Sequence, residues 1–139
     1  MRNTAPEVKG KAIHVVAGVI YSPARDRVLI ARRPEASHQG GLWEFPGGKL
    51  SEGELPLAAL SRELREELAI EVTRARPFLE IHHTYPDKVV FLDIWQVDEF
   101  TGKAKGNEGQ PIAWVGLDEL ENYAFPAANE AIIERLLGR

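Results

Sequence analysis

The amino-acid sequence predicts an α/β fold in which a mixed sheet lies between a central helix and a C-terminal helix. Two observations lead to this class. Several short segments are rich in β-branched and other apolar residues, as strands are, and two longer segments repeat their apolar residues at helical spacing. Because every sheet and helix has an apolar face to bury, packing the sheet between the helices is the natural arrangement.

The overall properties of the chain indicate one ordinary folded domain. Its 139 residues can bury a real core, so we expect a single domain over residues 1–139, with a loose polar end at residues 1–11. The sequence contains no cysteine, which excludes disulfides and thiolate metal sites. No apolar run approaches the roughly 20 residues that span a bilayer. We therefore expect a cytoplasmic monomer without a membrane partner. The net charge of −4 argues against stable binding to nucleic acid.

The first part of the chain predicts a hairpin and a short strand. Residues Ala12–Tyr21 are β-branched and apolar and indicate a central strand. Turn-forming residues follow at 22–26, and Val28–Arg32 is expected to return as the hairpin partner. After a polar loop at residues 34–42, Trp43–Phe45 is expected to form a short strand that leads to Pro46.

The segment Pro56–Ala69 predicts the central helix. Proline suits a first helical turn, and strong helix formers dominate the rest of the segment. Leucines at spacings of three and four form one apolar stripe: Leu57, Leu60, Leu64 and Leu68. Three carboxylates share a second face at positions i, i+3 and i+4: Glu63, Glu66 and Glu67.

The carboxylate face has two interpretations. Acidic helix faces are often only solvated, although like charges at this spacing repel by a few tenths of a kcal/mol per pair. Alternatively, the oxygen atoms form a site for a hard divalent cation such as Mg²⁺, with Mn²⁺ as a second possibility. Arg62 could hold one carboxylate through a paired hydrogen bond, and the preceding Gly47 and Gly48 offer backbone carbonyl ligands.

The second part of the chain predicts further strands, a mobile loop and a packing helix. In order, we expect a connection at residues 71–77, strands at Phe78–His83 and Val89–Asp98, a glycine-rich mobile loop at Thr101–Gln110, a strand at Ile112–Val115, a helical turn at Leu117–Leu120 and a helix at Ala127–Leu137. His82 and His83 would point to opposite sheet faces, so they cannot easily share one metal ion and are expected to be structural or solvent-facing.

The central segment resembles the Nudix box, whose pattern is G-x5-E-x7-R-E-U-x-E-E-x-G-U with U aliphatic. The matching residues are Gly48, Glu54, Arg62, Glu63, Leu64, Glu66, Glu67 and Ile70. Ala69 stands where the family has glycine. A left-handed alanine at a helix end costs about 1 kcal/mol, which affects the helix end rather than the chemistry. Runs outside the box resemble the MutT branch of the family: ARR at 31–33, WEFPGGK at 43–49, NEGQP at 107–111 and FPAANE at 125–130.

The resemblance implies an α/β/α sandwich and a Mg²⁺-dependent enzyme. The implied reaction is hydrolysis of a nucleoside triphosphate, above all 8-oxo-dGTP, to the monophosphate and pyrophosphate, which would remove oxidised nucleotides before they cause mutations. The metal ligands implied by matching positions are Gly47, Glu63, Glu66, Glu67 and Glu108. Among the acids, Glu63 is expected to be the base, with Glu108 second, while Arg62 orients a carboxylate and Glu54 lies behind the ligands.

The resemblance also implies residues that bind the nucleotide. Asn129 would read the base edge, because its amide can pair with both the O6 atom and the protonated N7 of 8-oxoguanine. Phe45 would support the base or its loop, Arg33 would border the sugar or base pocket, and Lys88 is a further candidate for substrate binding. Asn129 could instead only cap the C-terminal helix.

Two other functions remain open at this point. The enzyme could use another substrate, such as a pyrimidine triphosphate or a dinucleoside phosphate. It could also be a non-catalytic sensor of oxidised nucleotides, although sensors commonly lose glutamates of the box and this sequence keeps all of them.

Overall fold

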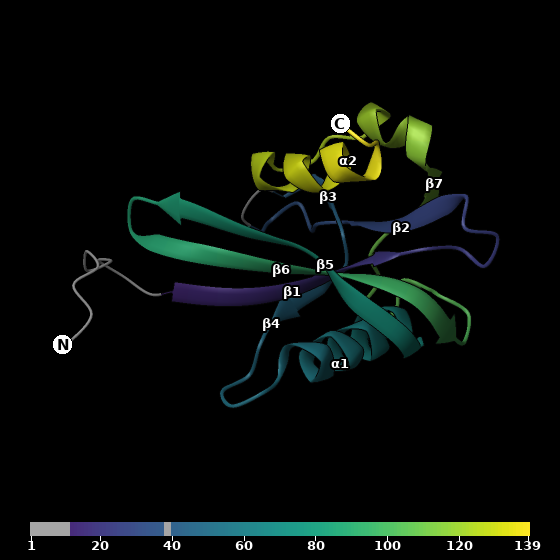
Figure 1. Ribbon diagram of the computed structural model, residues 1–139, viewed down its shortest axis with the longest axis horizontal. Helices are drawn as coiled ribbons and strands as arrows, with labels where there is room; N and C mark the ends of the chain where they lie inside the picture. The colour runs from purple at the N-terminus through teal and green to yellow at the C-terminus, as the bar shows by residue number, and fades with distance from the viewer. Residues whose placement is uncertain (1–11, 38–39) are drawn as a thin grey trace.

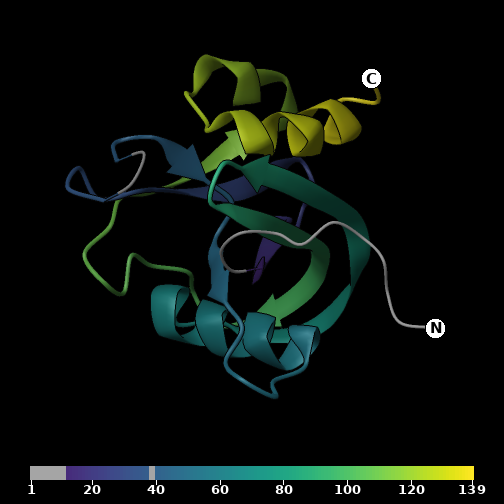
Figure 2. The same ribbon diagram turned by 90° about the vertical axis from the view of Figure 1, so that its left-hand side faces the viewer.

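The computed structural model describes residues 12–37 and 40–139, so the expected loose end at residues 1–11 lies outside the described residues. Two β-sheets lie between a long helix on one side and the shorter C-terminal helices on the other (Figure 1). Figure 2 shows the same separation after a quarter turn. This arrangement confirms the predicted layering of helix, sheet and helix.

The first sheet is mixed, as predicted, and has the order β4-β1-β6-β5. Its strands are β1 (Ala12–Ile20), β4 (Gly47–Lys49), β5 (Glu71–Tyr85) and β6 (Lys88–Thr101). Strand β1 pairs in parallel with β6 and antiparallel with β4, so it is central, as predicted.

The second sheet is antiparallel and corrects the predicted hairpin. Its order is β3-β2-β7, with β2 at Arg27–Arg32, β3 at Trp43–Glu44 and β7 at Ile112–Gly116. Strand β2 is not a hairpin partner of β1, because β4 and β6 already occupy both edges of β1. A single bridge between Tyr21 and Val28 remains between the two segments.

Strand β5 is longer than predicted. The expected connection at residues 71–77 is part of this strand, which pairs with β6 and contains register shifts near Arg74 and Pro77. Because β5 lies at the sheet edge, Pro77 can be accommodated without removing a bond from the sheet interior. The arginines and the proline of this segment do not favour a strand in the sequence. The strand forms because it pairs with β6.

Helix α1 (Pro56–Leu68) confirms the predicted central helix, with one change to its apolar stripe. Leu60, Leu64 and Leu68 are fully buried, whereas Leu57 is 41% exposed. The helix ends at Ala69, whose φ of 61° is left-handed as expected for this position.

The C-terminal segment is helical as predicted, in two pieces. Residues Ala127–Asn129 form a 3₁₀ turn, η2, that continues into helix α2 (Glu130–Leu136). The predicted turn at residues 117–120 belongs to a longer 3₁₀ segment, η1 (Leu117–Asn122). Among the described residues, no helix has the length and apolar character needed to cross a membrane.

The core forms on both faces of the first sheet. Val16 and Ile20 of β1 pack on the face with α1, while Ala17 and Val19 pack on the face with α2. Because side chains alternate along a strand, one strand supplies both clusters. The sheet is consequently fixed between α1 and α2.

Candidate active site

A cavity of about 380 Å³ opens on the α2 side of the first sheet. Its apolar residues come from β1, β6 and α2 and include Val15, Ala17, Leu92, Ile94 and Ile132. Polar side chains also line it: Arg33, Glu44, Lys49, His83, Lys88 and Asn129. An apolar cavity with a few polar groups is the usual form of a small-molecule site.

The cavity brings together the four residues predicted to bind substrate. Asn129, Arg33, Lys88 and Phe45 all line it. Asn129 occupies the N-cap position of α2, but its side chain makes no capping hydrogen bond, so capping does not account for its amide. Phe45 is only 3% exposed and stacks on Phe125 at 5.4 Å, which makes it a support of the cavity wall.

Strand β4 connects this cavity to the helix α1. Gly47 and Gly48 pair with Ala17 and Val16 of β1. A side-chain carbon at Gly47 would overlap the Val16 carbonyl, and one at Gly48 would overlap the Glu63 carboxylate. The glycines are therefore required by close packing within a strand, rather than by a sharp turn.

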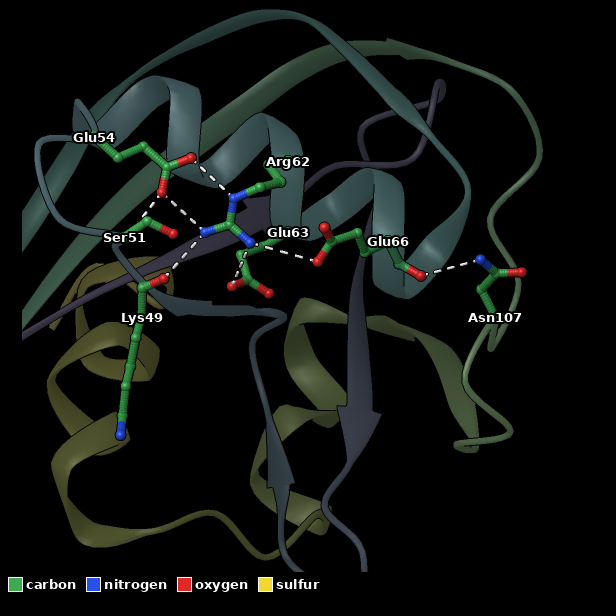
Figure 3. Close-up of polar contacts among 7 residues, drawn as sticks. All are labelled: Lys49, Ser51, Glu54, Arg62, Glu63, Glu66 and Asn107. Atoms are coloured by element: carbon green, nitrogen blue, oxygen red, sulfur yellow. Dashed lines mark hydrogen bonds and ion pairs between the residues drawn. The ribbon is translucent and has the colours of Figure 1, made fainter.

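Arg62 is the centre of the polar contacts on α1 (Figure 3). Its Nε and Nη2 atoms donate to the two carboxylate oxygens of Glu54, each at 2.9 Å. Its Nη1 atom donates to Glu63 at 3.2 Å and to Glu66 at 3.4 Å, and Nη2 also donates to the Lys49 carbonyl at 3.2 Å. The guanidinium thus contacts three carboxylates of the motif.

Glu54 is held as an ionised acid. The paired hydrogen bond from Arg62, together with the backbone amide of Ser51, lowers the pKa of Glu54 to about 2. The Ser51 amide donates to Glu54 Oε1 at 2.9 Å, which fixes the turn before α1. Glu54 thus joins the Ser51 turn to Arg62, and its place behind metal ligands stays a prediction.

Glu67 is in the opposite state. Burial raises the pKa of Glu67 to about 9, and a hydrogen bond with Glu63 and the charges of Glu63, Glu44 and Glu108 act in the same direction. The carboxyl groups of Glu63 and Glu67 therefore lie within hydrogen-bonding reach of each other. Like charges in a poorly hydrated space repel, and this repulsion favours the neutral form of Glu67.

The loop at residues 102–110 lacks regular structure, as predicted, but it is attached to the end of α1. The Lys105 and Asn107 amides donate to the Leu68 and Glu67 carbonyls at 3.1 and 2.9 Å. The side chains of Asn107 and Gln110 donate to the Glu66 and Glu67 carbonyls at 3.0 and 2.9 Å. These bonds satisfy carbonyls that a helix end leaves free, and they hold Glu108 near Glu67. The mobility of the loop, expected from its composition, stays a prediction.

The structure brings only some of the predicted metal ligands close together. In the described ranges 12–37 and 40–139, no three His, Asp or Glu side chains are arranged to hold a metal ion as they stand. Glu63 and Glu67 are nevertheless paired, next to the Gly47–Gly48 strand. All the donors that this cluster offers are oxygen atoms, and such a set fits a hard divalent ion.

Several cavity residues are absent from the sequence prediction. His83, which the sequence analysis expects to be structural or solvent-facing, is partly buried, lines the cavity and contacts Tyr85 at 4.6 Å. Ile81, His83 and Tyr85 are two residues apart along the strand and so share one face. This spacing could have indicated that His83 faces the cavity. Glu44 was also overlooked, although a carboxylate between Trp43 and Phe45 is unusual in an otherwise aromatic strand.

Comparison with known proteins identifies the family of this chain. A family model described as the NUDIX domain matches residues 16–135. The chain is 36% identical to the 8-oxo-dGTP diphosphatase of Escherichia coli (strain K12) over 126 residues, covering 91% of this chain and 97% of that protein. It is 37% identical to the CTP pyrophosphohydrolase of the same organism over 127 residues, covering 91% and 93%.

A solved structure gives the same relationship. A MutT chain from work on Aliivibrio salmonicida and Vibrio cholerae matches with a TM-score of 0.82 and 38% identity, covering 91% of this chain and 98% of that chain. The family model spans most of the chain, and the matches include both the box on α1 and the cavity-lining segments. The chain therefore belongs to the Nudix family, and it is a MutT-like Nudix hydrolase.

Proposed function

We propose that this enzyme hydrolyses 8-oxo-dGTP to 8-oxo-dGMP and pyrophosphate with Mg²⁺, and thereby removes oxidised guanine nucleotides. The observation that supports this most is the short strand β4, which lies between the base-sized cavity and the paired acids Glu63 and Glu67. A nucleotide with its base in the cavity would extend its phosphates along Gly47 and Gly48 toward α1. The 8-oxo-dGTP diphosphatase of Escherichia coli, 36% identical, supports the same substrate.

The acids of α1 would hold the metal, and the chain would supply the rest of the chemistry. We assign Glu63 and Glu67 as the main ligands, with the Gly47 carbonyl, Glu66 and Glu108 beside them. When bound, the divalent ion neutralises phosphate charge and increases the acidity of a water molecule. Glu63 would accept the proton of the attacking water, with Glu108 as the second candidate. Arg62 would keep Glu63 and Glu66 in place.

Base recognition is assigned to Asn129. Its side-chain amide has a donor and an acceptor, which match the O6 atom and the N7 proton of 8-oxoguanine. Ordinary guanine has no proton at N7, so one amide bond would be lost. An unpaired polar group costs about 1–3 kcal/mol. Arg33 and Lys88 would border the base or sugar, and Phe45 would support the wall from behind.

A paired assay of pyrophosphate release tests this function. We expect kcat/KM for 8-oxo-dGTP to exceed that for dGTP, and Asn129→Ala to reduce this ratio by about tenfold because one base-specific bond disappears. Glu67→Gln should abolish turnover, while its spectrum remains that of the folded protein. Near-normal turnover by Glu67→Gln with Mg²⁺ would remove Glu67 as a ligand, and an unchanged ratio in Asn129→Ala would move base reading elsewhere.

A pyrimidine triphosphate is the second candidate substrate. The CTP pyrophosphohydrolase of Escherichia coli is as similar to this chain, at 37% identity, as the 8-oxo-dGTP diphosphatase is. Adding CTP and dCTP to the same assay separates the two. A higher kcat/KM for CTP than for 8-oxo-dGTP would favour this second substrate. Pyrophosphate release with any of these nucleotides excludes a purely sensing module. The monomeric state and the cytoplasmic location stay predictions.

A further inference from the structure

Glu44 connects the nucleotide cavity with the acidic cluster, although it belongs to neither predicted set. Its carboxylate Oε1 accepts a hydrogen bond from Arg33 Nη1 at 2.7 Å, and both side chains line the cavity. The two side chains are 29% and 30% exposed, so the pair is partly shielded from water. Glu44 also lies near enough to Glu67 for its charge to act there. From this position Glu44 could have one of two roles: it could position Arg33, or it could assist the metal ligands.

The second sheet fixes the geometry of the pair. Strands β2 and β3 are antiparallel, with Ala31 opposite Glu44, so Arg33 follows directly beyond the end of the paired residues. The Arg33 amide donates to the Leu42 carbonyl at 2.8 Å, and the Gly41 amide donates to the Arg33 carbonyl at 3.0 Å. The backbone of Arg33 is thus held on both sides. Its side chain reaches the cavity wall, where its Nη1 atom donates to Glu44.

A carboxylate that is committed to a guanidinium is a poor additional metal ligand. The 2.7 Å bond is short and charge-assisted, which is the strong class of protein hydrogen bond. Burial raises the pKa of Glu44 even though Arg33 works against this effect, so the guanidinium compensates a charge that the site would otherwise disfavour. The predicted ligands come from α1, β4 and the 102–110 loop, whereas Glu44 belongs to the second sheet.

We propose that Glu44 is a positioning residue that holds the Arg33 guanidinium at the cavity wall and so sets the affinity for the nucleoside part of the substrate. This inference rests on the proposed function, because it assigns the cavity to a nucleotide. Glu44 acts through Arg33, and it contributes neither to metal binding nor to the hydrolytic step. Without the Glu44 charge, the Arg33 guanidinium would move away from the position in which it contacts the nucleoside.

The test compares Glu44→Gln with Glu35→Gln as a matched control. Glu35 forms an ion pair with the neighbouring Arg32 at 2.6 Å, but it is exposed and does not line the cavity. For Glu44→Gln we expect the KM for the triphosphate to rise about tenfold, with kcat and the Mg²⁺ concentration for half-maximal rate unchanged. Glu35→Gln should match the wild type in all three constants.

Binding of 8-oxo-dGMP without metal, followed by calorimetry, gives a readout independent of turnover. We expect the Kd to rise about tenfold in Glu44→Gln and in Arg33→Gln, with little further loss in the double variant, because the two residues act as one unit. Glu44→Asp, which keeps the charge, should recover part of the affinity and serves as the second variant if Glu44→Gln is poorly folded.

Two results would overturn the inference. A lower kcat and a higher Mg²⁺ requirement in Glu44→Gln, with KM unchanged, would make Glu44 part of the metal site. Additive losses of 8-oxo-dGMP affinity in the double variant would separate Glu44 from Arg33. Failure of the wild type to hydrolyse any of the triphosphates would instead contradict the proposed function, while the binding series would still test the pair.

Discussion

Glu54 and Glu67 belong to one motif, yet the residues around them favour opposite charge states. Arg62 lowers the pKa of Glu54 to about 2, while burial next to Glu63 raises the pKa of Glu67 to about 9. Near neutral pH the first acid is ionised and the second holds a proton. A divalent cation among the carboxylates would favour the ionised form of Glu67, so metal binding and loss of this proton are linked.

The metal-free protein should lose stability as the pH rises. The folded chain keeps a proton on Glu67 up to about pH 9, whereas the unfolded chain releases it near the ordinary carboxyl pKa of 4.5. The contribution of Glu67 is therefore fully present below about pH 4.5 and is lost as the pH approaches 9. We expect the free energy of unfolding in urea with EDTA to decrease over this window, and Glu67→Gln to remove most of the slope.

The exposed Glu66 provides the control for this titration. Glu66→Gln should leave the slope of unfolding free energy against pH in place, because Glu66 is not enclosed as Glu67 is. Addition of Mg²⁺ near neutral pH should release about one proton per protein, measured by calorimetry in buffers of different ionisation enthalpy. A slope that persists in Glu67→Gln would show that other groups cause the pH dependence.

At the scale of the element, α1 is bounded by residues of the motif at both ends. Pro56 begins the helix after the Ser51–Glu54 turn, and Leu55 provides no side-chain cap. Ala69 ends it in the left-handed conformation, with its amide bonded to the Arg65 carbonyl at 3.0 Å. The helix end is the one place where the sequence departs from the family pattern, so it is also where a substitution should improve stability.

Ala69→Gly should stabilise the protein by up to about 1 kcal/mol. Glycine adopts φ near 61° without the strain of a side chain, although greater freedom of the unfolded chain offsets part of the gain. Ala58→Gly is the matched control, because this exposed position in the same helix should lose about 1 kcal/mol. Urea unfolding measures both. Equal destabilisation by the two glycines would contradict the conformational argument.

At the scale of the whole molecule, the sequence predicted what depends on local pattern. Helical spacing of Leu60, Leu64 and Leu68 was sufficient to place α1, and β-branched runs were sufficient to place β1 and β6. The second sheet was missed because β2 and β7 are far apart in sequence, and only their pairing shows that they are neighbours. The Arg33–Glu44 pair is close in sequence, but it was also missed because it depends on the register of β2 and β3.

The loop between β6 and β7 joins the two sheets to α1, and this junction depends on Gln110. Its amide donates to the Glu67 carbonyl at 2.9 Å, and its Oε1 atom accepts the Glu108 amide at 2.9 Å. One side chain therefore holds the end of α1 and the backbone of a proposed ligand together. Nothing in the composition of the loop indicates this role, because glycine and polar residues alone favour mobility.

Gln110→Ala should consequently weaken both stability and turnover. Loss of two hydrogen bonds should lower the free energy of unfolding by about 1–3 kcal/mol, and kcat should fall more than KM rises because Glu108 loses its fixed position. Gln96→Ala is the control: it removes a 2.8 Å bond to Asp98, and neither residue lines the cavity. It should lower stability by about 1 kcal/mol with kcat retained. Urea unfolding and pyrophosphate release measure the two effects. Equal losses of kcat in both variants would mean that general destabilisation, rather than placement of Glu108, limits the enzyme.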